Sequence, residues 1–124
     1  MHRYTAIAFS ALVLTILFSS SVFSADIPAR SAKTRTVYVK AMMFKFAPDK
    51  INMRKGETLK LKITSKDVEH GFRISMMGLN YPIEHGKVTE VVLTPTTVGD
   101  LVADCGVYCG AGHKKMKLSI NVLP

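Results

Sequence analysis

The sequence contains no tryptophan, only two cysteines and few aromatic side chains, which make up 8% of its 124 residues. No stretch keeps a helical period of apolar residues over three turns, and neither a repeat nor a low-complexity tract is evident. No pair of residues suited to general acid and base catalysis is visible. These absences argue against a helical domain, a repeat architecture and chemistry that needs a general acid and base.

The first residues have the pattern of an export signal. A short basic start precedes the mostly apolar run Tyr4–Phe18, and a small, weakly polar stretch follows it. We predict a signal peptide over residues 1–24, a flexible leader over 25–35 and one domain over 36–124, which is about the size of a single small domain. The apolar run is shorter than the roughly 20 residues that cross a bilayer, so a retained anchor is the weaker alternative. The domain is therefore expected to be periplasmic or secreted, with no stable membrane span.

Positive charge dominates the chain. Seventeen Lys and Arg face nine Asp and Glu, and the formal net charge is +8. This charge predicts an acidic partner, although a merely solvated basic surface is an equal alternative. Nucleic acid is not expected as a partner, because an exported chain rarely meets it.

Short runs of alternating apolar residues, separated by turn residues, predict a mostly β domain. About seven strands of this kind form a Greek-key β-sandwich, in which functional loops gather at one end of the two sheets. The strands are expected at Thr36–Met43, Lys50–Met53, Thr58–Thr64, Gly71–Met76, Lys87–Leu93, Asp100–Ala103 and Lys117–Val122.

A loop between the last two expected strands concentrates soft metal ligands. Cys109, His113 and Met116 supply a thiolate, an imidazole and a thioether, the donors that favour copper. Glycines within the loop allow the tight curvature that turns several side chains toward one point. His70, at the start of a strand and next to Gly71, is the fourth candidate donor.

The arrangement resembles the CuA copper site of cytochrome c oxidase subunit II and of nitrous oxide reductase. The shared pattern is Cys, three residues, Cys-Gly, two residues, His, two residues, Met, with an upstream His before a strand. The resemblance implies a cupredoxin-like fold, a binuclear copper centre and single-electron transfer without catalysis by the domain itself. It also implies the ligand set: bridging thiolates from Cys105 and Cys109, one imidazole for each copper from His70 and His113, and weak bonds from the Met116 sulfur and the Val107 carbonyl.

Several alternatives remain open. Two cysteines in an exported protein usually form a disulfide, and Cys109, His113, Met116 and His70 alone would suit a mononuclear blue-copper site. Cys105 is the residue that favours two coppers over one.

A lone loop histidine, His85, is a weak further metal candidate. Met42, Met43, Met76 and Met77 form either a copper-loading surface or, as we expect, part of the core, because paired strand methionines place one side chain inward.

The resemblance is incomplete in ways that affect the partner. In oxidase subunit II the carbonyl ligand belongs to a glutamate that also faces a magnesium site, and a tryptophan receives electrons from cytochrome c, whereas this sequence has Val107 and no tryptophan. The subunit also has transmembrane helices and an acidic docking face. We therefore expect an exported electron carrier that exchanges electrons with an acidic redox protein, such as a c-type cytochrome or a terminal reductase or oxidase. A copper chaperone or tolerance protein is the alternative.

Overall fold

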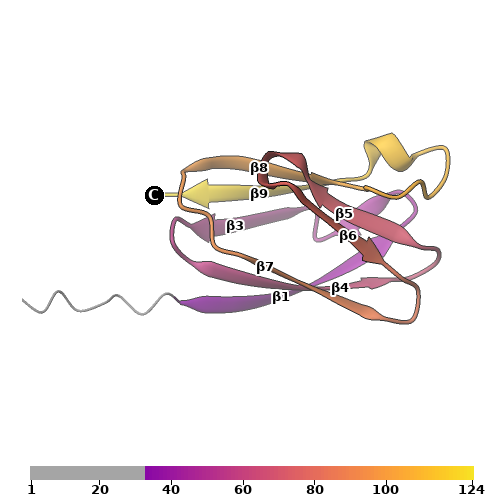
Figure 1. Cartoon of the computed structure of the whole chain (residues 1–124), viewed down its shortest axis with the longest axis horizontal. Helices are drawn as coiled ribbons and strands as arrows, with labels where there is room; N and C mark the ends of the chain where they lie inside the picture. The colour runs from indigo at the N-terminus through magenta and orange to yellow at the C-terminus, as the bar shows by residue number, and fades with distance from the viewer. Residues whose placement is uncertain (1–32) are drawn as a thin grey trace, which may run out of the picture.

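Two β-sheets pack face to face (Figure 1), and the alternation of side chains along the strands places apolar residues between them. In β4, for example, Leu59, Leu61 and Ile63 are fully buried while their neighbours are partly exposed. The computed structural model describes residues 33–124, so the predicted signal peptide and most of the predicted leader lie outside the described residues. The strands are β1 (Thr34–Met42), β2 (Lys45–Ala47), β3 (Lys50–Arg54), β4 (Thr58–Ser65), β5 (His70–Ile74), β6 (Leu79–Ile83), β7 (Val88–Leu93), β8 (Gly99–Asp104) and β9 (Lys117–Leu123), with 3-10 turns η1 (Ser75–Met77) and η2 (His113–Lys115).

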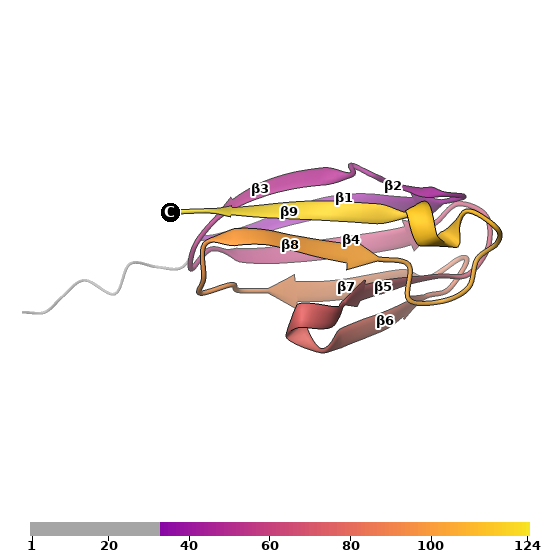
Figure 2. The same ribbon diagram turned by 90° about the horizontal axis from the view of Figure 1, so that it is seen from above.

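The two sheets contain four and five strands. Their orders are β2-β1-β4-β7 and β3-β9-β8-β5-β6, with the β1–β4 and β3–β9 pairs parallel and the other pairs antiparallel. The chain crosses repeatedly from one sheet to the other, and Figure 2 shows the two layers from above. This confirms the predicted all-β sandwich with Greek-key connections.

The core between the sheets is made of aliphatic side chains around two aromatic rings. Phe46 of β2 and Phe72 of β5 are almost completely buried and meet edge to face, with ring centroids 6.1 Å apart. Such a pair adds about 0.5–1.5 kcal/mol to the free energy gained by burial alone. Because Phe72 lies two residues after His70, this packing also fixes the start of β5.

The structure has two strands more than the sequence pattern predicts, β2 and β6. β2 is only three residues long, and Pro48 follows it. β6 contains Asn80 and Pro82, which lowered its strand propensity, but it lies at a sheet edge, where a proline is tolerated. The expected strand Gly71–Met76 ends at Ile74, where η1 begins.

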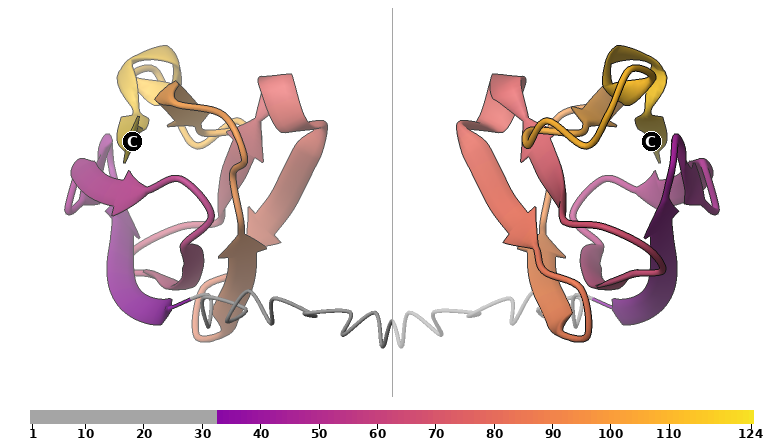
Figure 3. Two further views of the ribbon diagram at one scale, coloured as in Figure 1. Left: turned by 90° about the vertical axis from the view of Figure 1, so that its left-hand side faces the viewer. Right: turned by 90° about the vertical axis from the view of Figure 1, so that its right-hand side faces the viewer.

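Several connections meet at one end of the sandwich. The β1–β2 turn, the β4–β5 loop, the β6–β7 turn and the long β8–β9 loop lie there, opposite the C-terminus, as Figures 1 and 3 show. The β4–β5 loop is tied to β1 by a hydrogen bond from Lys66 N to Ala41 O, 2.9 Å long.

The β5–β6 hairpin is joined to β8 through one register pair, Arg73 opposite Asp104. The same two residues form an ion pair through two hydrogen bonds of 2.8 and 3.2 Å.

Within residues 33–124 no helix has the length and apolar character needed to cross a membrane.

Candidate metal centre

Both cysteines lie buried in the β8–β9 loop. Cys105 directly follows β8 and is 1% exposed, and Cys109 is 8% exposed. Their sulfur atoms are 3.4 Å apart as free thiols, and the Cys105 thiol donates a hydrogen bond of 2.9 Å to the Val107 carbonyl. Met116, fully buried just before β9, places its sulfur 4.0 Å from that of Cys109. The loop therefore brings three sulfur atoms and a carbonyl oxygen together.

His70 joins this group from the other hairpin. The first residue of β5 is fully buried, and its ring nitrogen lies with the two cysteine sulfurs in a cluster whose donor atoms are all within 4.8 Å of one another. Nε2 of His70 is 2.6 Å from Oδ1 of Asp67, which holds the ring in place. Nδ1 is buried and has no partner.

His113 occupies the start of η2, beyond the cysteines. It stands outside the cluster formed by His70, Cys105 and Cys109. Its Nδ1 is also buried without a partner, and its ring lies against that of Tyr108, with centroids 5.6 Å apart. Among residues 33–124, the buried side-chain nitrogen and oxygen atoms that lack a partner are the Nδ1 atoms of these two histidines.

Gly71 allows the hairpin to approach the cysteine loop closely. A Cβ atom at this position would lie 2.5 Å from Val107 N and 2.7 Å from Gly106 N, too close for any side chain. The Gly71 amide also points at Cys105 Sγ, 3.5 Å away. A backbone N–H in this position stabilises negative charge on the sulfur.

The pKa values of Asp67 and Cys109, two titratable groups at the cluster, are shifted in opposite directions. Burial raises the pKa of Asp67, but hydrogen bonds from Met43 N, His70 and Val68 N outweigh it and lower the pKa to about 2. Burial, together with the neighbouring Cys105, raises the pKa of the Cys109 thiol. Without metal the Cys109 thiol is thus protonated at neutral pH, whereas Asp67 is a carboxylate that accepts a hydrogen bond from Nε2 of His70.

The residues present fit a copper centre. Copper favours thiolate, imidazole and thioether donors, and all three kinds meet in this buried loop region. A histidine ligand is usually oriented by a hydrogen bond to its other nitrogen, and Asp67 provides this bond for His70. This bond leaves Nδ1 as the free ring nitrogen of His70, and Nδ1 of His113 is likewise buried without a partner.

The comparison with protein families supports the same conclusion. The model of the family "Cytochrome C oxidase subunit II, periplasmic domain" matches residues 15–123. The chain belongs to this family. The family membership confirms the predicted resemblance to the copper domain of subunit II and the predicted periplasmic location.

Individual members of the subunit II family are similar to parts of the chain. Cytochrome c oxidase subunit 2 of Thermus thermophilus is 38% identical over 81 residues, which cover 65% of this chain and 60% of that protein. The chain thus spans less than two thirds of this relative. A solved heme-copper terminal oxidase dimer matches at 26% identity with a TM-score of 0.68, over 77% of this chain and 68% of the other.

The periplasmic domain of subunit II of cytochrome oxidase from Bradyrhizobium japonicum has a TM-score of 0.65 at 16% identity. This match covers 71% of this chain and 83% of that one. At this identity it supports the fold alone. Together, the family and the His/Cys/Cys cluster support copper, within an electron-transfer domain of the oxidase subunit II type.

His85, a weak metal candidate that we expected to be without metal, is exposed and lies outside the cluster, beside Ser65 at the end of β4. Of the first methionine pair, Met42 is partly buried and Met43 is 46% exposed, which agrees with one side chain pointing inward. The expected core role is wrong for Met76 and Met77, which are 79% and 38% exposed, because they lie in the 3-10 turn η1, where strand alternation does not apply.

Sequence reasoning did not single out Asp67. It orients His70, and it also ties the β1–β2 turn to the site by accepting a 2.8 Å hydrogen bond from Met43 N. A carboxylate three residues before a candidate ligand histidine was the feature in the sequence that could have identified it.

Proposed function

We propose that this domain holds two copper ions in a CuA-type centre and passes single electrons to or from an acidic redox protein. Cys105 and Cys109 would supply thiolates to both ions, His70 and His113 would hold one ion each, and Met116 and the Val107 carbonyl would be weak ligands. The observation that carries the proposal is the pair of buried thiols 3.4 Å apart, with an unpartnered buried Nδ1 on each of the two histidines.

The position of His113 favours two ions over one. The donors of a single ion must all lie close to one another, as those of His70, Cys105 and Cys109 do. His113 carries an unpartnered buried nitrogen and stands outside that group. A second ion, bound through the same two sulfurs, accounts for this nitrogen.

When bound, a thiolate-bridged copper pair supplies a redox group that gains or loses one electron with little change in geometry. The chain's own residues hold the ligands and exclude water. Asp67 keeps Nε2 of His70 occupied, so that Nδ1 is the atom presented to metal. The Gly71 amide stabilises charge on Cys105, and burial of both cysteines keeps solvent out. Because one electron moves and no bond of a substrate breaks, the domain needs no acid or base.

The test is copper stoichiometry together with the electron paramagnetic resonance spectrum of the oxidised domain, which is reconstituted with copper after any disulfide has been reduced. We expect two coppers per chain and hyperfine lines shared by two nuclei. Cys105→Ser is the decisive variant, since it leaves a thiolate, two imidazoles and a thioether and should bind one copper with a single-nucleus spectrum. One copper per chain in the unaltered domain would refute the binuclear centre.

A second candidate function, copper delivery or tolerance, is favoured by the exposed thioethers of Met43 and Met76, because thioethers bind Cu(I). A copper-handling protein should lose copper quickly to a competing metal-free protein, whereas an electron carrier should retain both ions through repeated oxidation and reduction. Copper retention after such cycles, measured against a Cu(I) chelator of known affinity, separates the two.

A further inference from the structure

Exposed apolar side chains gather around the turn that carries His113. Tyr108 is 76% exposed and lies against the His113 ring. Phe44, 37% exposed, packs over the other side of the loop, where its ring is the first group that a Cβ atom on Gly110 or Gly112 would meet. Met43 is also exposed, and its sulfur lies 3.9 Å from the place of a Gly110 Cβ atom. These three side chains, which we term the loop-end surface, flank one turn of the proposed centre.

The loop-end surface is held in position. Oδ2 of Asp67 accepts the hydrogen bond from Met43 N, while Oδ1 of the same carboxylate contacts His70. The β1–β2 turn is thereby fixed to a residue of the site. A surface that is already ordered loses little conformational entropy when a partner binds.

Exposed lysines are sequence neighbours of the residues that form or support the loop-end surface. Lys45 follows Phe44, Lys66 precedes Asp67, and Lys114 and Lys115 lie in η2 directly after His113; all four are exposed. None of these lysines forms an ion pair with a carboxylate of residues 33–124. Glu69 and the partly exposed Asp67 oppose this charge in the same loops, but the four lysines outnumber them, so the rim is positive.

We propose that the loop-end surface is the docking site of an acidic redox protein whose own redox group is surrounded by apolar side chains. This inference rests on the proposed electron-transfer function. The lysine rim attracts and orients the partner at long range, whereas Tyr108, Phe44 and Met43 form the dry contact that brings the partner close to His113. One electron then passes between the copper centre and the partner's redox group, so that one is oxidised as the other is reduced.

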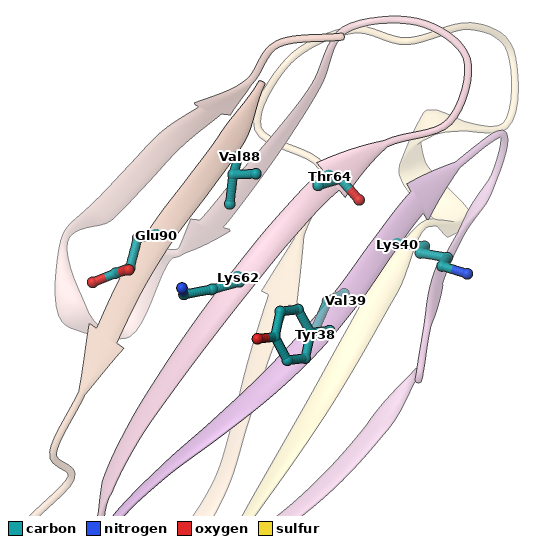
Figure 4. A pocket seen from close by; sticks show the side chains of 7 residues that line it. All are labelled: Tyr38, Val39, Lys40, Lys62, Thr64, Val88 and Glu90. Carbon is teal, nitrogen blue, oxygen red and sulfur yellow. The ribbon is translucent and has the colours of Figure 1, made fainter. Parts of the chain in front are cut away.

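The outer face of the β1-β4-β7 sheet provides a matched control. Figure 4 shows a shallow hollow there, with Tyr38, Lys40 and Lys62 among its lining residues. Tyr38 is 71% exposed, close to the 76% of Tyr108, and the two lysines are the same residue type as those of the rim. The hollow lies on strands rather than on the β8–β9 loop, so substitution of its lysines or of Tyr38 should not affect docking.

The first experiment compares two double variants, Lys114→Glu with Lys115→Glu, and Lys40→Glu with Lys62→Glu. Each copper-loaded, reduced protein is mixed with an oxidised c-type cytochrome of net negative charge, and the second-order rate constant is followed by stopped flow. We expect the rim variant to react about tenfold more slowly at low ionic strength, with the difference shrinking as salt rises. The sheet variant should change the rate far less. Equal losses in both variants would show that only net charge matters and would overturn the proposal.

The apolar contact is tested in the same assay with Tyr108→Ala and Tyr38→Ala. Removing the Tyr108 ring should lower the rate constant roughly tenfold at low and at high salt, since the contribution is not electrostatic. The Tyr38 variant should match the unaltered protein. Copper content is measured for each variant, so that damage to the centre is not mistaken for lost docking; an unchanged rate in Tyr108→Ala would remove the apolar contact from the proposal.

A final measurement separates the docking site from the copper chemistry. The metal-free, reduced domain, labelled with nitrogen-15, is titrated with the same unlabelled cytochrome. Amide shifts concentrated at Phe44, Tyr108 and Lys114 support the docking site even if the centre proves not to be binuclear. Shifts concentrated at Tyr38 and Lys62 contradict the proposed docking site even if two coppers are found. Tighter binding of a basic cytochrome c than of the acidic one at the loop-end surface also contradicts it.

Discussion

Replacing Gly71 by alanine tests how closely the β5–β6 hairpin approaches the cysteine loop. The added Cβ atom would lie 2.5 Å from Val107 N, whereas ordinary contact begins at 3.4 Å, so the loop has to move by about 1 Å. The nearest atoms are backbone atoms of Gly106 and Val107, which cannot rotate away as a side-chain end would. The displaced segment joins Cys105 to Cys109 and carries the carbonyl proposed as a weak ligand.

The expected cost can be estimated from opposing effects. Overpacking of this kind costs about 1–3 kcal/mol. A glycine replaced by alanine at an ordinary backbone conformation otherwise gains about 0.4–1 kcal/mol through the unfolded chain. We expect the metal-free Gly71→Ala protein to lose about 1–2 kcal/mol of unfolding free energy, which lowers Tm by roughly 5–15 °C in a domain of this size.

The effect on copper should be larger than the effect on stability. A metal site tolerates ligand displacements of only about 0.2 Å, so a shift of about 1 Å in the loop should abolish the two-copper spectrum. Gly86→Ala is the matched control: its φ is +78°, which strains an alanine, but nothing lies within 4 Å of the added atom. Both variants should lose stability, and only Gly71→Ala should lose copper. A Gly71→Ala protein with two coppers and an unchanged spectrum would refute the reasoning.

Three further predictions concern the metal-free protein. Asp67→Asn should lower the free energy of unfolding by about 1–2 kcal/mol at pH 7, because the pKa of Asp67 is lowered from 3.8 to about 2 and the carboxylate is only 30% exposed. In urea unfolding, the difference in stability between this variant and the unaltered protein should vanish as the pH falls from about 4 to 2. The Cys109 thiol, whose pKa burial raises, should react with a small thiol reagent at pH 7 at least about tenfold more slowly than free cysteine and should speed up as the pH rises; fast reaction at pH 7 would contradict this. Phe72→Leu should cost about 1–2 kcal/mol through a small cavity and the lost ring contact with Phe46, and a loss below about 0.5 kcal/mol would show that the pair adds little.

The strands with regular alternation were predictable from sequence, and the irregular ones were not. β4 and β9 bury every second residue, so their pattern is plain. β6 has the same relation to the core, but Pro82 and Asn80 obscure it, and only its edge position makes the proline acceptable. The prediction that one methionine of the Met76–Met77 pair is buried failed for a related reason, because this pair lies in a 3-10 turn rather than in a strand.

The candidate ligands were predictable where their spacing is local or where the resemblance supplies them. The spacing from Cys105 to Met116 is local, His70 came from its place before a strand, and the structure places the Cys109 sulfur 3.4 Å from that of Cys105 and 4.0 Å from that of Met116. What spacing could not give is the contact between separate connections, such as Asp67 with Met43, or Phe44 over the copper loop. These contacts depend on how the β1–β2 turn is set against the β4–β5 loop, which is a property of the assembled sandwich.

The single register pair between β5 and β8 bears on how metal enters and leaves. His70 belongs to the β5–β6 hairpin and the cysteines follow β8, so the two halves of the site are joined in the sheet only where Arg73 faces Asp104. Swinging the hairpin outward breaks few ladder hydrogen bonds and leaves the β1–β4 and β3–β9 pairs intact. Swinging the hairpin outward would also take Phe72, Ile74 and Ile83 out of the core, so we expect it to cost more free energy than fraying of a loop but less than global unfolding, and amide hydrogens of β5 should exchange with solvent sooner than those of β4. Such an opening would expose His70 and the cysteines to solvent while the rest of the sandwich stays folded.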